Sequence, residues 1–314
     1  MKILVTGGAG FVGSHLTEHL LKLGHNVVAV DDLSLGTLEN IRGFEKNPRF
    51  TFIKLNLLAK KRTEELFKKN KFDCVFHLAA NSDIQKSRLY PSIDLKKTFM
   101  TTYNVLECMR SAGVEQIVFT SSSAIYGETD QRIHEDLGPL LPTSFYGAAK
   151  LSSEGFISAF CVNYGIKAWI LRFPNVVGER ATHGVVYDFV RKLKKNPKEL
   201  EILGDGKQEK PYAYVKDIVE GIIYAWKHSN DDINIFNLGT QTTTTVTKIA
   251  QTLVTEMNLK NVKFKYTGGD RGWTGDVPKY QYDLTKIHKL GWKAKHNSDQ
   301  AVRTAIKAIL KNGR

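Results

Sequence analysis

Three tyrosines in the sequence are each followed, four residues later, by a lysine. The pairs are Tyr146/Lys150, Tyr212/Lys216 and Tyr282/Lys286. Residues four apart share one face of a helix, so such a phenol and ammonium group can meet over one ligand. A tyrosine hydroxyl ordinarily titrates at about 10, and a nearby cation favours its phenolate form. A pair of this kind is therefore a candidate base for removing a proton from a substrate hydroxyl.

Only the first pair follows a strand whose end is rich in hydroxyl groups. That strand ends in "FTSSSAIYG", and Ser122 lies 24 residues before Tyr146, whereas the other two pairs fall in the later part of the chain. Ligands of a doubly wound sheet bind at the carboxyl ends of its strands. We expect Ser122 to hydrogen-bond the substrate oxygen and to orient Tyr146. A capped loop without a ligand is the structural alternative.

The glycine-rich stretch "VTGGAGFVGSHL" follows the first apolar run and opens a predicted helix. Glycines let the backbone turn tightly and approach a pyrophosphate, whose charge then lies against the amides of the helix N-terminus. The second apolar run ends at Asp31, eighteen residues after Gly13. A carboxylate there accepts hydrogen bonds from ribose hydroxyls and repels a 2'-phosphate, which predicts NAD rather than NADP.

Asn56 follows the third apolar run and can offer its amide oxygen to the adenine amino group, although a surface-loop asparagine is the alternative. The candidate cofactor-binding residues are Gly7, Gly10, Phe11, Val12, Asp31, Asp32, Asn56, Leu57, Leu78, Ala79, Ala80, Tyr146 and Lys150.

A parallel sheet is needed to bring these residues together. The apolar runs "KILVT", "NVVAV", "FTFIKL", "FDCVFHLAA" and "EQIVFTSSS" alternate with helix-like or loop segments. A helix from about Thr143 to Tyr164 and a sixth strand at 166–173 follow. Continuous apolar strands alternating with helices are typical of a sheet covered on both faces. We predict an α/β protein with a Rossmann doubly wound parallel sheet.

The pattern changes after Pro174, and a chain of 314 residues has room for about two lobes. "GVVYDFVRKLKK" reads as a helix, "LEILGDG" as a strand and turn, and helices are expected near 246–257 and 298–311. We predict a smaller mixed α/β C-terminal lobe that binds the substrate. The predicted division is a cofactor domain at 1–173 with returning segments at about 212–240, and a second lobe at 174–211 and 241–314.

The net charge of +13 favours an anionic partner such as nucleic acid, a membrane surface or a phosphorylated metabolite. The lysines are scattered, however, and their clusters include acids, as in "KKRTEELFKKN". Such mixed clusters are typical of solvated faces. The charge therefore favours an anionic ligand only weakly, and we expect no nucleic-acid partner.

Cys74, Cys108 and Cys161 are widely spaced and form no CxxC motif, so we expect buried reduced thiols and no metal site. The apolar "MKILV" lacks the cleavage site of a signal peptide, and no apolar run approaches about 18 residues. We expect a cytoplasmic protein that does not enter a membrane.

Several ordered motifs resemble a known family. "GGAGFVG", "HLAA", "SSSAIYG", "YGAAK" and "LRFPNVVG" resemble the extended short-chain dehydrogenase/reductases, which include the NAD-dependent epimerases and dehydratases, and the likeness runs nearly end to end. It is strongest to the UDP-glucose 4-epimerases, especially compact ones carrying "HGVVYDF", "LGDG" and "RGWTGDVP".

The resemblance implies an NAD-dependent nucleotide-sugar 4-epimerase that interconverts UDP-glucose and UDP-galactose. In that family the tyrosine takes the proton of the 4-hydroxyl, NAD accepts hydride, and the 4-keto intermediate turns over before hydride returns to its opposite face. Carried over by motif, the catalytic residues are Ser122, Tyr146 and Lys150. The implied substrate-binding residues are Ser122, Ser123, Tyr146, Asn175, Lys210, Arg271 and Asp276.

Some positions depart from the family pattern. Lys210 stands where the family usually has arginine, and lysine lacks the two-pronged contact of a guanidinium with phosphate. Lys86 follows "HLAA", and Lys97 and Thr98 stand where the family often has asparagine. Tyr280 matches a position at which bulk disfavours N-acetylated sugars, although a core aromatic residue is an equal explanation.

Three other functions compete with this interpretation. A 4,6-dehydratase needs acids after the active-site serine, where this chain has Ser123 and Ala124. A UDP-glucuronate 4-epimerase is harder to exclude, because Arg180 is a candidate partner for a sugar carboxylate. A basic member of the fold that binds RNA is the non-enzymatic alternative. The resemblance also implies a homodimer formed through two helices per subunit, around 91–113 and 143–164.

Overall fold

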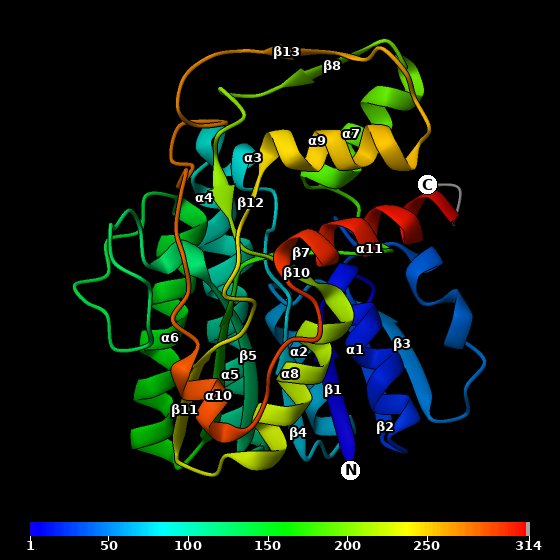
Figure 1. Ribbon diagram of the computed structural model, residues 1–314. Coiled ribbons are helices and arrows are strands. Elements are labelled where there is room, and N and C mark those ends of the chain that lie inside the picture. Colours follow the sequence, from blue (N-terminus) through cyan, green and yellow to red (C-terminus); the bar gives the residue numbers. More distant parts are fainter. Residues whose placement is uncertain (312–314) are drawn as a thin grey trace.

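The computed structural model describes residues 1–311, and its centre is a sheet of seven parallel strands (Figure 1). The strand order is β11-β6-β5-β4-β1-β2-β3. The order reverses between β1 and β4, and the loops at such a switch point diverge to leave a crevice for a ligand. The strands are β1 (Lys2–Thr6), β2 (Asn26–Asp31), β3 (Phe50–Lys54), β4 (Cys74–His77), β5 (Gln116–Ser122), β6 (Lys167–Phe173) and β11 (Ile233–Asn237).

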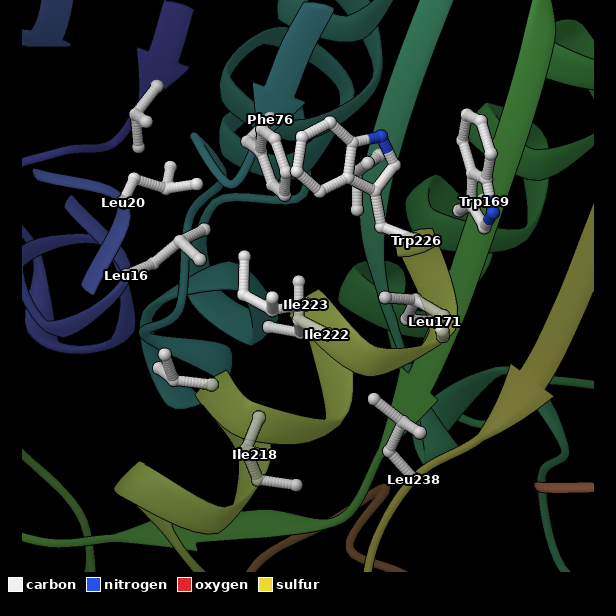
Figure 2. Close-up of a cluster of buried hydrophobic side chains, with 14 of the residues drawn as sticks. Leu16, Leu20, Phe76, Trp169, Leu171, Ile218, Ile222, Ile223, Trp226 and Leu238 are labelled. Atoms are coloured by element: carbon white, nitrogen blue, oxygen red, sulfur yellow. The ribbon is translucent and has the colours of Figure 1, made fainter. Parts of the chain in front are cut away.

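Helices cover both faces of the sheet, as continuous apolar strands require. One face packs against α1 (Phe11–Lys22), α8 (Val215–His228) and α10 (Thr285–Leu290). Figure 2 shows part of this core, where the rings of Phe76 and Trp226 meet edge to face with centroids 5.1 Å apart. The other face packs against α2 (Lys60–Lys69), α5 (Thr101–Ala112) and α6 (Phe145–Tyr164). The predicted Rossmann doubly wound fold is confirmed.

The segment that precedes α5 is irregular. The helical region expected around 91–113 consists of α4 (Ser92–Asp94), a wide π-helical turn η3 (Leu95–Met100) and then α5. Thr101 Oγ1 donates to the Lys97 and Thr98 carbonyls, at 2.7 and 3.1 Å, and Thr102 Oγ1 donates to the Thr98 carbonyl at 2.8 Å. These bonds compete for the carbonyls of the helical ladder, which accounts for the wider turn. The short helix α3 (Ile84–Leu89) lies just before this segment.

A smaller lobe of mixed α/β structure lies over the carboxyl ends of the strands, at the top of Figure 1. Its core joins buried residues of α7, α9, α11 and the short strands around them. Its strands pair as β7 with β10, β8 with β13, and β9 with β12. Its elements are β7 (Asn175–Val177), α7 (Val185–Lys195), β8 (Glu199–Ile202), β9 (Glu209–Lys210), β10 (Tyr212–Tyr214), β12 (Thr244–Thr245), α9 (Val246–Glu256), β13 (Lys263–Tyr266) and α11 (Ser298–Lys311).

The segment 212–240 connects the two lobes. Strand β10 pairs with β7, whereas α8 packs on α1 and β11 extends the main sheet beside β6. The exact domain boundaries stay predictions. Three short 3₁₀ turns complete the described secondary structure: η1 (Leu38–Asn40), η2 (Arg42–Phe44) and η4 (Ser123–Ile125).

All three cysteines are buried and free, as predicted. Among residues 1–311, no helix is long and apolar enough to cross a membrane.

Candidate active site

The glycine-rich loop between β1 and α1 forms a narrow backbone cradle. Gly7 has a φ of +69°, which favours glycine, and a Cβ placed on Gly13 would lie 2.0 Å from the Gly7 carbonyl oxygen. Helix α1 begins after Gly10, which provides no side-chain cap, and its first turn carries no acid. Its first amides are therefore open to an anion, so the loop fits a pyrophosphate group.

Two carboxylates at the end of β2 border this loop. Asp31 accepts hydrogen bonds from the amides of Leu33 at 2.8 Å and Ala9 at 3.2 Å. Burial raises the pKa of Asp31, and these amides act in the opposite direction. Burial also acts to raise the pKa of Asp32, but hydrogen bonding with Ser34 and the Lys97 ammonium outweigh it and lower that pKa. Both groups can accept from ribose hydroxyls when ionised.

The loop and these carboxylates lie along a first cleft at the carboxyl edge of the sheet. All thirteen candidate cofactor-binding residues line it, and they come from the ends of β1 to β4 and from α1 and α6. The Asn56 side chain lies there too, although its Oδ1 accepts from the Leu58 amide at 2.9 Å and shapes the local turn. All the segments that were predicted from the sequence to bind a dinucleotide thus line this one cleft.

Tyr146 and Lys150 lie in the first turns of α6, which begins after the cap made by Ser144 Oγ and the Gly147 amide. Lys150 is 2% exposed, and its Nζ donates to the Thr120 carbonyl oxygen at 2.6 Å. The same Nζ lies 5.8 Å from the centre of the Tyr146 ring. The ammonium group therefore lies near the phenol ring, as expected, but its hydrogen bond is to a backbone carbonyl of β5 and not to the tyrosine hydroxyl.

The surroundings shift the pKa values of both groups. Burial raises the pKa of Tyr146, and its hydrogen bond with Ser122 partly offsets this. Burial lowers the pKa of Lys150 to about 7, against the effect of Glu154 and Asp94. The expected acidification of Tyr146 by the ammonium is therefore not seen in the protein alone. A further positive charge beside the phenol is needed to favour the phenolate near neutral pH.

A second, larger cleft of about 670 Å³ opens between the sheet and the smaller lobe. Six of the seven candidate substrate-binding residues line it: Ser122, Ser123, Tyr146, Asn175, Lys210 and Asp276. Tyr146 lines both clefts and so stands where their contents would meet. Ser123 Oγ donates to the Tyr280 hydroxyl at 3.0 Å, which brings Tyr280 into the wall beside the serines.

Lys210 and Asp276 form a buried ion pair in the smaller lobe. Lys210 Nζ lies 5.4 Å from the centre of the Trp273 ring, and the second carboxylate oxygen of Asp276 accepts from the Gly272 amide at 3.2 Å. The indole Nε1 of Trp273 is buried and has no hydrogen-bond partner within the described chain. This wall therefore holds one cation, one anion and one free donor.

Arg271 is the one candidate substrate-binding residue that does not line the second cleft. Its guanidinium pairs with Glu128 at 2.7 Å and with Asp270 at 3.3 Å, and it is partly exposed. It lies directly before Gly272 and Trp273, which do line the cleft. A rotation of its side chain is needed to bring it to a phosphate.

The other two tyrosine-lysine pairs do not reproduce this arrangement. Tyr282 is fully buried in the core next to the sheet. Lys216 forms an ion pair with Glu179 at 2.8 Å, away from Tyr212. Of the three pairs, Tyr146/Lys150 is the one in which both residues line the first cleft, where β5 ends.

Sequence reasoning missed several residues of the site. Four of them line both clefts: Ser121, Phe173, Thr182 and His183. Thr120 lines the first. The end of the predicted strand at 173 was a signal for Phe173, because side chains at that edge face the crevice. Thr182 and His183 lie in a loop whose path depends on the smaller lobe, so no local pattern indicated them. Among residues 1–311, no cluster of His, Cys, Asp or Glu could hold a metal ion.

A dinucleotide cradle, a second ligand cleft and a tyrosine at their junction fit a dinucleotide-dependent enzyme. The model of the NAD-dependent epimerase/dehydratase family matches residues 3–239. The chain belongs to this family, its cofactor is NAD, and the resemblance found in the sequence is confirmed.

Individual relatives agree with the family match. The chain is 32% identical to a putative UDP-glucose 4-epimerase of Methanocaldococcus jannaschii, over 99% of each protein. It is similar to the crystal structure of UDP-glucose 4-epimerase with UDP-glucose from Thermotoga maritima, with a TM-score of 0.90, 32% identity and full coverage of both chains. It also resembles the Thermus thermophilus UDP-glucose 4-epimerase complex with NAD, with a TM-score of 0.87, 31% identity and 98% of each chain covered.

Proposed function

We propose that the protein is an NAD-dependent UDP-glucose 4-epimerase that interconverts UDP-glucose and UDP-galactose. The observation that carries the proposal is the position of Tyr146, which lines both the cofactor cleft and the larger second cleft. The similarity to UDP-glucose 4-epimerases over the whole chain supports the choice of substrate.

The protein groups have distinct tasks in this proposal. Tyr146 as phenolate takes the proton from the sugar 4-hydroxyl, and Ser122, its hydrogen-bond partner, holds the substrate oxygen beside it. Lys150 supplies positive charge that favours the phenolate. After the sugar has turned, Tyr146 returns the proton to the same oxygen, which leaves the tyrosine ready for another cycle.

The residues present fit the cofactor. A Cβ at Gly7 or Gly13 would lie 2.9 or 2.0 Å from neighbouring backbone atoms, and Asp31 offers carboxylate oxygens at the end of β2. Bound NAD supplies a positively charged nicotinamide ring that favours an adjacent phenolate and takes hydride from the sugar carbon before returning it. The chain contributes the cradle, the orientation of the sugar and the base.

The smaller lobe is proposed to hold the nucleotide half of the substrate. Asn175 and Lys210 line the second cleft and are assigned to the diphosphate, and Asp276 to the nucleotide. Arg271 is assigned to a phosphate after it leaves Glu128. Because Lys210 is tied to Asp276 by a buried ion pair, its contact with phosphate is expected to be that of a point charge.

A UDP-glucuronate 4-epimerase needs a cation beside the sugar carboxylate, and Arg180 was the candidate. Its Nη2 lies 2.6 Å from Glu18 of α1, and the residue does not line the second cleft. This favours a neutral hexose over a uronate. A 4,6-dehydratase is disfavoured because Ser123 and Ala124 occupy the wall where acids are needed.

We also propose that the protein is a cytoplasmic homodimer. The faces of η3 and α6 expose large apolar side chains, among them Leu95, Phe145, Phe156, Val162 and Tyr164. These residues lie on the two helical segments that the family uses for dimers, and exposed apolar side chains there support an interface. Three free thiols suit a reducing compartment.

The test is incubation of the purified protein with UDP-glucose, UDP-galactose, UDP-glucuronate and N-acetylated analogues, followed by chromatographic separation of the products. We expect UDP-glucose and UDP-galactose to interconvert, and the bulk of Tyr280 beside Ser123 to disfavour the N-acetylated sugars. Inversion of none of these sugars would reject the epimerase assignment. A filter-binding assay that finds salt-sensitive RNA affinity and no inversion would favour the non-enzymatic alternative.

A further inference from the structure

A buried carboxylate that is not part of the catalytic pair lies on α4, which packs against the helix that carries the pair. Asp94 of α4 is fully buried. Its Oδ1 accepts from Thr98 Oγ1 at 2.9 Å and from Asn81 Nδ2 at 3.2 Å, and neither partner carries a charge. Its Oδ2 is buried and has no hydrogen-bond partner within the described part of the chain. A buried carboxylate with only neutral partners costs free energy unless a cation lies near.

The hydrogen bonds around Asp94 lead to the wall of the cofactor cleft and to α6. The Asn81 amide donates to Thr98 Oγ1 at 3.1 Å, and Asn81 directly follows the cleft-lining Ala79 and Ala80. On the other side, Thr102 Oγ1 donates to the Thr98 carbonyl at 2.8 Å and accepts from Ser153 Oγ at 3.3 Å. Ser153 lies three residues after Lys150, so Asp94 is connected to the helix of the catalytic pair.

Few other charges face Lys150. Glu154, on the same helix, is bound by Arg172 of β6 at 2.6 Å, which offsets its negative charge. His77 of β4 hydrogen-bonds Thr6 and Thr102, and burial lowers its pKa to about 3, so it is neutral. Strand β5 presents the Thr120 carbonyl and the Phe119 ring. Of the two carboxylates within residues 1–311 that act on Lys150, Glu154 is paired with Arg172, whereas Asp94 has no ion pair.

We propose that Asp94 is a positioning residue whose buried carboxylate is the counter-charge that keeps Lys150 an ammonium ion beside Tyr146. This inference rests on the proposed function. The direction agrees with the electrostatics, because the Asp94 charge acts to raise the pKa values of both Lys150 and Tyr146. Asn81 and Thr98 hold the carboxylate in place. Asn81 lies in "NSDIQKS" and Thr98 in "KKTFMTT", the two stretches in which this sequence departs from the family pattern.

The test is the pH dependence of turnover by the holoenzyme of the Asp94→Asn variant. The substitution keeps the shape of the side chain and removes its charge. Both limbs of the bell-shaped kcat profile should move to lower pH, by about one unit, because each of the two groups loses a nearby anion. A role confined to folding would lower the activity at all pH values without moving either limb, and that result would overturn the inference.

The protonation of the Lys150 side chain can also be measured directly by NMR, without measuring turnover. The ¹³Cε resonance of lysine-labelled holoenzyme, assigned by its loss in Lys150→Arg, should titrate at lower pH in Asp94→Asn than in the wild type. Equal midpoints in the two proteins would refute the counter-charge.

Two further variants keep the test informative. Ser87→Ala removes a hydrogen bond to Asn81 Nδ2 in the same cluster and leaves the Asp94 charge in place, so its profile should keep the wild-type limbs. If Asp94→Asn does not fold, the double variant Asp94→Asn/Thr98→Asp returns a carboxylate to the cluster and should restore both stability and the wild-type limbs. Failure to restore them in folded protein would count against the inference. If the wild type inverts no nucleotide sugar, the proposed function fails instead.

Discussion

Tyr146 and Lys150 lie one helical turn apart, yet their hydrogen bonds point in different directions. Lys150 donates to the Thr120 carbonyl, and Tyr146 is hydrogen-bonded to Ser122. The lysine can therefore act on the phenol through its charge but not through a direct hydrogen bond. Because burial raises the pKa of Tyr146, the protein groups alone leave the phenol a poor base, and the positive charge of the nicotinamide becomes essential.

Replacement of Tyr146 by Phe should reduce kcat by about a thousandfold, because only the ionisable hydroxyl is lost. The ring and its packing stay, so the circular dichroism spectrum and the NAD content should match those of the wild type. Steady-state kinetics with UDP-galactose measures the effect. Near-normal turnover would show that another group is the base.

Replacement of Lys150 by Met should abolish turnover and remove a pH dependence from the stability of the cofactor-free protein. Burial lowers the pKa of Lys150 to about 7, whereas the unfolded side chain titrates at about 10.4. At pH 6 the folded wild type holds the Lys150 ammonium near the buried Asp94, so the substitution removes one charge and leaves the other without its counter-charge. Between pH 7 and 10 the unfolded state of the wild type binds more protons than its folded state, so its free energy of unfolding should rise relative to that of the variant.

Urea unfolding at several pH values measures this rise. A difference in the free energy of unfolding between the two proteins that stays constant from pH 7 to 10 would contradict a lysine whose pKa is lowered by burial.

At the scale of the elements, the phosphate cradle depends on the close approach of Gly13 to Gly7. Gly13→Ala would place a Cβ 2.0 Å from the Gly7 carbonyl, so the loop must shift and its amides can no longer surround a pyrophosphate. We expect NAD affinity to fall at least about tenfold, or 1.4 kcal/mol. Calorimetric titration of cofactor-free protein measures it.

Gly43→Ala is the matched control, because a Cβ at Gly43 meets nothing within 4 Å. Wild-type affinity in Gly13→Ala would mean that the cradle does not hold the pyrophosphate.

The elements of the sheet could be predicted because each strand is a continuous apolar run that ends in a distinctive loop. The glycines after β1, Asp31 after β2 and Ser122 at the end of β5 follow local rules, and the shared edge of a parallel sheet brings them together. The pairing of Lys210 with Asp276 joins residues 66 apart, and that of Arg180 with Glu18 joins residues 162 apart. No local pattern indicates such contacts. The π-helical turn η3 likewise depends on threonine hydroxyls that bond back to the helix.

At the scale of the whole molecule, the exposed apolar faces of η3 and α6 predict a dimer. Leu95 is 55% exposed and Val162 is 80% exposed, so both can be replaced by Asp with little effect on the folded chain. The double variant Leu95→Asp/Val162→Asp should run as a monomer in light scattering coupled to size exclusion, where the wild type should have the mass of two chains. Like charges buried against each other would oppose association.

Leu38→Asp is the control for this prediction, because Leu38 is 54% exposed on the 3₁₀ turn η1, outside the proposed interface. The control should keep the wild-type mass. A wild-type chain that is monomeric at micromolar concentration would remove the dimer from the proposal.

The central claim is that the sugar is oxidised and reduced again at a single carbon, in the space that Tyr146 shares between the two clefts. The direct test is incubation of the holoenzyme with UDP-glucose deuterated at C4, followed by mass spectrometry and NMR of the UDP-galactose formed. Deuterium should stay on C4 while the configuration inverts, because the hydrogen never reaches water. Loss of the label to solvent, or no inversion at all, would contradict it.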